Sequence, residues 1–148
     1  KKYTVPISKQ RLLCFWKMIK DKNFPSKGKT FLIALLSLYK SEETKNLLKK
    51  IYQTQDSEVK KAILCYLDMR WSAADHLFII QQLKNELNDN NQLFEILLEI
   101  IKKKKIFESF HLLRLISKST YSENRIRIAQ TIIDTMRYNF PINRNGEI

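Results

Sequence analysis

The residues that could support metal or acid–base chemistry in this chain are few and scattered. His76 and His111 lie far apart, and neither is followed by a metal-ligating residue three or four positions later. Because a metal site needs several convergent His, Cys or carboxylate ligands, the sequence predicts no metal and no cofactor. His111 lies in the apolar run Phe110–Leu113, so we expect it to be a hydrogen-bonded packing histidine.

The two cysteines, Cys14 and Cys65, each lie among apolar residues. This setting predicts small buried hydrophobic side chains with reduced thiols rather than a disulfide framework. Reduced thiols favour a cytoplasmic location.

Two carboxylates, Asp68 and Asp75, flank Trp71 and would be the nearest approach to an acid–base pair. Helix capping and pairing with Arg70 explain them more simply. Nothing in the sequence marks a Ser–His or Cys–His nucleophile. We therefore predict that the chain is not an enzyme and has no catalytic residues.

The most conspicuous charge feature is the run Lys102-Lys103-Lys104-Lys105, which lies where one predicted helix ends and the next begins. Lysines at the carboxyl end of a helix interact favourably with the negative end of the helix dipole. This interaction and exposure to solvent at a turn are enough to explain the lysine run without a binding role. Contact with phosphate or with an acidic protein is the alternative, and the sequence leaves both open.

The composition predicts helices throughout. The 148 residues include only two glycines and three prolines, whereas 44% are hydrophobic and 28% are charged. So few turn residues argue against an all-β fold and against glycine-rich phosphate loops. No run of 18 or more apolar residues occurs, as a membrane-spanning helix would require.

Apolar residues recur at three- and four-residue intervals, which is typical of amphipathic helices. We expect a single domain over residues 1–148 with a helical core at about 8–138 and an irregular tail at 139–148. Because the chain begins at Lys1 rather than Met, we also expect it to be a fragment of a longer protein. The predicted helices are roughly 8–22, 28–40, 42–54, 57–70, 73–87, 91–104, 106–118 and 123–138.

The second helix of each predicted pair begins with an apolar residue followed three positions later by a small or apolar one. These starts fall at positions 31, 59, 93 and 126, so the steps along the chain are 28, then 34, then 33. A period of roughly 30 residues is typical of helical-repeat proteins. One such hairpin cannot bury its own apolar face, so neighbouring hairpins are expected to stack. The pairs are Phe31/Ala34, Val59/Ala62, Leu93/Ile96 and Ile126/Ala129.

Two segments, 56–62 (DSEVKKA) and 122–129 (SENRIRIA), resemble the turn and second-helix start of HEAT repeats. That family has an Asp, a short polar turn, Val-Arg, and Ala three residues after the Val. The unit at Asp89 keeps the Asp but has Phe94 in place of the Arg, and the first unit keeps neither. The resemblance covers roughly residues 28–138 and implies an all-α, HEAT-like α-solenoid of about four stacked antiparallel hairpins, eight helices in all. A tetratricopeptide array is the rival at this period, but its Trp-Leu-Gly-Tyr pattern is absent.

In HEAT-like arrays the basic position often forms a ladder with the turn Asp of a neighbouring repeat. If this carries over, Asp56 and Asp89 pair with Lys60 and Arg127 and hold the repeats in register. Such exposed pairs would contribute only about 0–1 kcal/mol each.

Most aromatic side chains fall on apolar stripes and are predicted to lie in the core, with Trp71, beside Arg70 at a turn, as the one expected to be exposed. The core set is Phe15, Trp16, Phe31, Tyr39, Phe78, Phe94, Phe107 and Phe110.

In a HEAT-like stack the second helices line one curved surface, which is the usual contact surface for a partner protein. We therefore predict a protein-binding scaffold whose partner and oligomeric state the sequence does not identify. Mixed charge on these helices fits a protein better than a nucleic acid duplex, which needs an unbroken basic surface. The residues predicted to contact the partner are Lys60, Lys61, Glu95, Glu99, Lys102, Lys103, Lys104, Lys105, Arg125 and Arg127.

The net charge of +12 leaves two further partners to consider. The alternative function is nucleic-acid binding of the DNA-alkylation-repair type, which uses a basic concave face. An acidic membrane surface is the other, because residues 1–30 hold nine Lys and Arg and a single acid, Asp21. The expected location is the cytoplasm, in the second case at the inner face of the membrane.

Overall fold

The computed structural model describes residues 7–86, 92–117 and 123–139, and within these ranges all regular structure is helical. Each of the eight predicted helices has one counterpart, so the all-α prediction is confirmed. Single turns of 3-10 helix at Tyr52–Thr54 (η1), Ala73–Asp75 (η2) and Phe107–Ser109 (η3) flank three of them. The helices are α1 (Lys9–Lys20), α2 (Ser26–Leu36), α3 (Glu42–Ile51), α4 (Ser57–Met69), α5 (His76–Asn85), α6 (Leu93–Lys104), α7 (Phe110–Ser117) and α8 (Glu123–Asn139).

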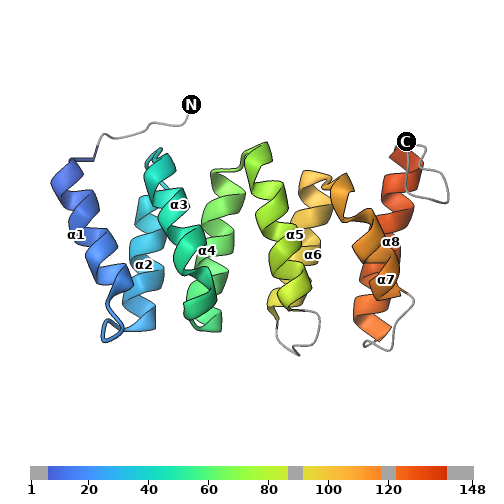
Figure 1. Cartoon of the computed structure of the whole chain (residues 1–148), viewed down its shortest axis with the longest axis horizontal. Coiled ribbons are helices and arrows are strands. Elements are labelled where there is room, and N and C mark those ends of the chain that lie inside the picture. Colours follow the sequence, from blue (N-terminus) through green and yellow to red (C-terminus); the bar gives the residue numbers. More distant parts are fainter. Residues whose placement is uncertain (1–6, 87–91, 118–122, 140–148) are drawn as a thin grey trace. The chain divides into compact units, whose positions relative to one another are not determined.

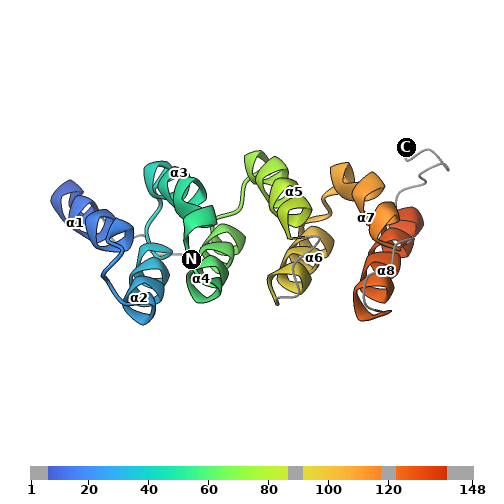
Figure 2. The same cartoon turned by 60° about the horizontal axis from the view of Figure 1, so that its bottom comes forward.

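The chain divides into two compact units, residues 1–72 (unit 1) and 73–148 (unit 2). In unit 1, α1 to α4 run alternately in opposite directions (Figure 1). Helix α1 packs on α2 and α3, and α4 packs on α2 and α3. The first helices of the two hairpins, α1 and α3, therefore form one layer and the second helices, α2 and α4, form the other (Figure 2).

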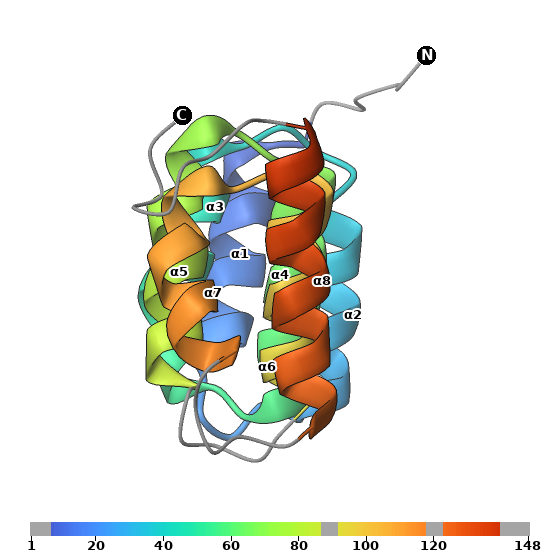
Figure 3. The same cartoon turned by 90° about the vertical axis from the view of Figure 1, so that its right-hand side faces the viewer.

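Unit 2 repeats the same plan. Helix α5 packs on α6 and η3, α7 packs on α8, and α6 packs on α8. Seen end-on, α5 and α7 lie on one side of this unit and α6 and α8 on the other (Figure 3). Each unit thus consists of two helix hairpins.

Side-chain caps fix the beginnings of several helices. The Ser8 hydroxyl accepts from the Arg11 amide, the Ser41 hydroxyl accepts from the Thr44 amide, and the Asp56 carboxylate accepts from the Val59 amide at 3.0 Å. Each satisfies an amide that has no partner within its own helix. Polar residues in the turns thereby mark where one helix stops and the next starts.

The cores of the hairpins repeat in register. The residue numbers of the equivalent buried side chains rise by 31 from α2 to α4 and by 34 from α4 to α6. Hairpins that repeat one structural unit bury apolar residues at equivalent positions. The step of 28 predicted between the first two repeats is therefore wrong, and 31 replaces it. The buried sets are Leu32, Ile33 and Leu36 on α2, Ile63, Leu64 and Leu67 on α4, and Leu97, Leu98 and Ile101 on α6.

Phe31 is not a core residue, contrary to the prediction, because 64% of it is exposed. The run Phe31–Leu36 is apolar at every position and so covers all sides of its helix. Periodicity alone cannot identify which side of such a helix another helix covers. Of the other predicted core aromatics, Phe94 and Phe110 are buried, and Phe15, Trp16, Tyr39, Phe78 and Phe107 are half-buried.

Both cysteines and one histidine also lie where the sequence did not predict. Cys14 on α1 and Cys65 on α4 have exposed thiols, so the prediction of buried side chains is wrong. His111 is exposed as well, with its ring edge-on to Phe110 at a centroid distance of 6.0 Å. All three have apolar sequence neighbours, but they lie on the outer faces of their helices.

Candidate functional site

Across residues 7–86, 92–117 and 123–139, no group of three or more His, Cys, Asp or Glu side chains lies close enough together to hold a metal ion. His76 Nδ1 lies 3.4 Å from Glu108 Oε1 in unit 2. No helix in the described ranges is both long enough and apolar enough to cross a bilayer.

Two predicted partner-binding residues, Lys60 and Lys61, lie on α4 in unit 1 and are half-buried. The Lys60 ammonium lies 5.3 Å from the centroid of the buried Tyr52 ring, a distance at which a cation is attracted to the ring face. Lys60 therefore also helps to hold α4 against η1.

The predicted residues on α6 and α8 divide into exposed and buried side chains. Glu95, Glu99 and Arg127 are exposed in unit 2. Arg125, in contrast, is only 7% exposed, and its guanidinium carbon lies 4.3 Å from the centroid of the Phe94 ring. A guanidinium stacked on an aromatic face in this way contributes to packing. Arg125 thus joins α8 to α6.

The lysine run forms the stop signal of α6. Lys105 adopts a left-handed conformation with φ 54° and ψ 54°. The Ile106 amide donates to the Ile101 carbonyl at 3.1 Å, while the Lys105 amide donates to the Lys102 carbonyl at 3.4 Å. These two bonds define a Schellman motif, and Ile106 and Ile101 are both fully buried, as that motif requires. Lys102, Lys103 and Lys105 are exposed, and Lys104 is half-buried.

Asp56 contacts the hairpin that precedes it. Its carboxylate accepts hydrogen bonds from the Ser26 hydroxyl at the start of α2 and from the Val59 amide. These two hydrogen bonds, with the nearby Lys29 ammonium, hold the pKa of the Asp56 carboxyl below its usual value. These contacts of Asp56 link α4 to α2, and the other predicted ladder residue, Asp89, lies outside the described residues.

Unit 1 exposes large apolar side chains on its second helices. On the α2 side, Phe31 is 64% exposed and Leu38, just past the helix end, is 52% exposed. On α4, Met69 is 52% exposed and Cys65 is exposed. Phe31 and Ala34 on α2 are separated by one helical turn, as are Cys65 and Met69 on α4, so each pair lies on one side of its helix. We call Phe31, Ala34, Leu38, Cys65 and Met69 the apolar second-helix face.

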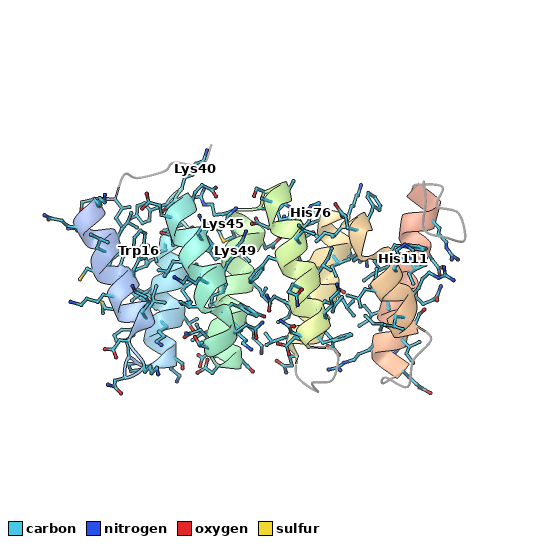
Figure 4. The ribbon with its side chains drawn as sticks, in the orientation of Figure 1. Trp16, Lys40, Lys45, Lys49, His76 and His111 are labelled. Carbon is cyan, nitrogen blue, oxygen red and sulfur yellow. The ribbon has the colours of Figure 1, made fainter. Side chains whose placement is uncertain are left out.

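A cleft opens in unit 1 where α3 begins and α4 ends, with a volume of about 410 Å³. We call it the α3/α4 pocket. A volume of this order is typical of sites for small molecules or single side chains. Figure 4 labels two of its lining residues, Lys40, which precedes α3, and Lys45, near the start of that helix. The lining residues are Lys40, Ser41, Glu42, Lys45, Tyr66, Met69, Arg70, Trp71 and Ser72.

The pocket walls are held by several contacts within the unit. Lys45 is only 3% exposed, and its Nζ lies 3.5 Å from Ser72 Oγ. Arg70 Nε donates to the Ser37 carbonyl at 2.7 Å, so Arg70 does not form the predicted pair with a carboxylate. The Tyr66 hydroxyl donates to the Ser41 carbonyl at 3.4 Å, and burial raises the pKa of Tyr66 to about 12. The phenol is therefore neutral near pH 7.

Sequence reasoning singled out Arg70 and Trp71 but missed Lys40 and Lys45 as members of a site. The offset of 31 residues between equivalent positions of the first two hairpins could have identified these two lysines. The numbers of Ser41 and Ser72 differ by 31, the same offset that relates the cores of α2 and α4. Equivalent turns of successive hairpins lie at the same end of a stack, so both turns line one pocket.

The ten predicted partner-binding residues are divided between the two units. Lys60 and Lys61 belong to unit 1, and the other eight belong to unit 2. Comparisons of the chain with protein-family profiles, with curated proteins and with solved structures found no match.

Proposed function

We propose that this chain is a non-catalytic interaction domain, a HEAT-like stack of helix hairpins that holds a partner protein on the outer face of its second helices. The apolar second-helix face is the observation that supports this proposal. Phe31, Leu38 and Met69 are each more than half exposed, and all three belong to the α2 and α4 side of unit 1. Grouped exposed apolar side chains are typical of protein interaction sites.

The chemistry around this face indicates the kind of partner. Lys27 precedes Phe31 by one helical turn on α2, and Lys61 precedes Cys65 by one turn on α4. Large apolar side chains supply binding energy at the centre of an interface, and charges at its rim give orientation and specificity. A partner segment with apolar side chains between acidic ones would complement this surface. Of the residues predicted from the sequence, Lys61 belongs to its edge.

The proposal is tested by removing the face and leaving the fold. A Phe31→Ser/Leu38→Ser variant should lose the proteins that co-purify with the wild type from cells of the source organism. The matched variant Leu77→Ser/Leu115→Ser alters two exposed leucines of the first helices of unit 2 and should keep them. Equal recovery with both variants would contradict the proposal.

Nucleic-acid binding is the second candidate, and the charge of unit 1 favours it. Residues 1–72 hold 16 Lys and Arg against 6 Asp and Glu, a net charge of +10. Titration with a random-sequence duplex at low and physiological salt separates the two functions. Binding that weakens steeply with salt would indicate phosphate contacts and promote this candidate. No binding at low salt would remove it.

The predicted contact with an acidic membrane surface rests on α1. Lys9, Lys17 and Lys20 are exposed on this helix, which contains no acidic residue. Co-sedimentation with vesicles containing an anionic lipid, compared with neutral vesicles, tests it. A charge-reversed Lys17→Glu/Lys20→Glu variant should lose any such binding, since each basic residue near an anionic surface contributes about 1 kcal/mol.

A further inference from the structure

We propose that the α3/α4 pocket binds a phosphomonoester group through Lys40, Lys45 and Arg70. The group could belong to a small metabolite or to a phosphorylated side chain of a partner protein. This goes beyond the proposed function, because a small phosphate ester would bind whether or not the second-helix face holds a protein.

Charge is the first argument. Three of the nine lining residues, Lys40, Lys45 and Arg70, are cationic, and one, Glu42, is anionic. The lining therefore carries a net charge of +2. A phosphomonoester carries about −1.5 to −2 at pH 7, whereas a single carboxylate carries −1. The neutral Tyr66 phenol adds no negative charge, since its pKa is about 12.

The orientation of Arg70 is the second argument. Its Nε is bonded to the Ser37 carbonyl at 2.7 Å, which fixes the plane of the guanidinium. Neither Nη of Arg70 has a hydrogen bond to another group among the described residues. An Arg side chain held in this way keeps two nitrogens for a bidentate contact with phosphate oxygens, and it loses little side-chain entropy when a ligand binds.

Other polar groups line the same space. Lys45 is 3% exposed and places an ammonium at the pocket lining beside the Ser72 hydroxyl. Helix α3 begins here, and the Thr44 amide is already capped by the Ser41 hydroxyl. The positive end of the α3 dipole then adds to the attraction for an anion.

The pocket suits a terminal phosphate better than a nucleic acid backbone. A phosphodiester carries one negative charge and two ester substituents, and both substituents would have to leave a single cleft. The exposed surface next to the pocket includes Met69, which both lines it and belongs to the apolar second-helix face. An apolar neighbour fits a protein segment or a small organic ester.

Tryptophan provides a direct reporter. The chain has two tryptophans, of which Trp71 lines the pocket and Trp16 does not. The Trp16 indole donates to the Thr44 hydroxyl at 3.0 Å and supplies an internal reference (Figure 4). Titration of the whole chain with phenyl phosphate, followed by the two indole NH signals in NMR spectra, should shift the Trp71 signal more than the Trp16 signal.

Substitutions then identify the groups responsible. Lys40→Gln should weaken phenyl phosphate binding about tenfold, as expected for loss of one charge-assisted hydrogen bond. Lys50→Gln removes an exposed lysine of α3 outside the pocket and should leave binding within about twofold of wild type. Arg70→Gln should abolish binding, with its helix content checked by circular dichroism because the Ser37 contact is lost. Phe31→Ser should have no effect on binding.

The ligand arms complete the test. Tighter binding of a phosphoserine peptide than of phenyl phosphate assigns the group to a partner segment, and the reverse assigns it to a small ester. Benzoate should bind at least tenfold more weakly. Equal binding of benzoate, equal weakening by Lys40→Gln and Lys50→Gln, tighter binding of single-stranded DNA, or no Trp71 shift would each overturn the inference.

Discussion

The two units share a four-helix plan but differ in what their second helices present to solvent. In unit 1, Phe31 on α2, Leu38 just past the end of α2, and Met69 on α4 are exposed. In the described part of unit 2, the exposed residues of α6 and α8 include Glu95, Glu99 and Arg127. The two large exposed apolar residues described in that unit, Leu77 and Leu115, belong to the first helices α5 and α7.

Charge separates the units as well. Residues 1–72 carry a net charge of +10, and residues 73–148 hold 11 Lys and Arg against 9 Asp and Glu, a net charge of +2. The buried apolar sets are nevertheless equivalent, since Ile63, Leu64 and Leu67 on α4 correspond to Leu97, Leu98 and Ile101 on α6. Equivalent buried residues are thus present in both units, whereas the exposed residues differ. The exposed apolar residues of unit 1 form its candidate binding face.

The largest expected effect comes from substitutions in the equivalent buried sets of the two units. Leu67 is fully buried in unit 1, so Leu67→Ala should lower the free energy of unfolding by about 2–5 kcal/mol. The equivalent Ile101→Ala in unit 2 should have a loss of the same order. Urea unfolding followed by circular dichroism measures both.

Leu38→Ala is the control for these core substitutions, because Leu38 is 52% exposed. Its effect on stability should stay within about 0.5 kcal/mol. A core substitution no more costly than Leu38→Ala would show that the equivalence of the buried sets is wrong.

Arg125 and Arg127 allow a comparison, within unit 2, between a buried arginine and an exposed arginine. Arg125 is buried against Phe94, so Arg125→Ala should cost about 1–2 kcal/mol through the lost stacking and packing. Arg127 is exposed, and Arg127→Ala should cost at most about 0.5 kcal/mol. Thermal unfolding of the two variants measures both losses of stability. A larger loss for Arg127→Ala than for Arg125→Ala would show that Arg127 is the arginine that stabilises the fold.

Asp56 provides a pH-dependent test of how the hairpins of unit 1 are joined. Asp56→Ala should lower the stability at neutral pH by about 1 kcal/mol, as expected for loss of an N-cap. Because its hydrogen bonds with Ser26 and Val59 lower the folded-state pKa, this contribution is present above the usual Asp pKa of about 3.9 and is lost as the pH falls through the folded value.

Denaturation of the wild type and the variant at neutral and acidic pH measures this change, and the two curves should converge at low pH. Asp56→Asn keeps a capping side chain and should retain most of the stability at neutral pH. A difference between wild type and Asp56→Ala that does not vary with pH would contradict the assigned role of the carboxylate.

The smallest effect is a gain in stability in unit 2. Lys105 has a left-handed backbone, with φ 54°. Lys105→Gly should therefore stabilise the protein by up to about 1 kcal/mol. Lys103→Gly, inside the exposed part of α6, should destabilise it by about 0.5–1 kcal/mol. Opposite signs in thermal unfolding would support the Schellman stop, and two losses would refute it.

The sequence predicted the helices well and their faces poorly. Helical periodicity and polar turns located all eight helices, and the helix predicted at 57–70 corresponds closely to α4 at Ser57–Met69. Phe31 and Cys14 were misplaced because both lie in runs that are apolar on every side of the helix. Which side is buried depends on the neighbouring helices, and this is a tertiary property.

The α3/α4 pocket also depends on tertiary contacts that the local sequence does not predict. Lys45 is buried although lysine is among the residues least often found in cores, and no local pattern predicts that. Arg70 donates to the carbonyl of Ser37 in an earlier hairpin, a contact that local spacing does not contain. With an offset of 31 rather than 28 residues between the first two repeats, the sequence alone would have predicted that the turns at Ser41 and Ser72 lie together.

The exposed Cys65 allows a direct test of whether the apolar second-helix face of unit 1 is the protein-binding surface. In a Cys14→Ser background, benzophenone maleimide on Cys65 is compared with the same label on Thr131→Cys in a Cys14→Ser/Cys65→Ser chain. Thr131 is exposed on α8, a second helix of unit 2. After addition to a lysate of the source cells and irradiation, we expect a discrete protein adduct from Cys65 that Phe31→Ser abolishes, and none from position 131. Equal adducts from both positions, or an adduct from position 131 alone, would contradict this expectation.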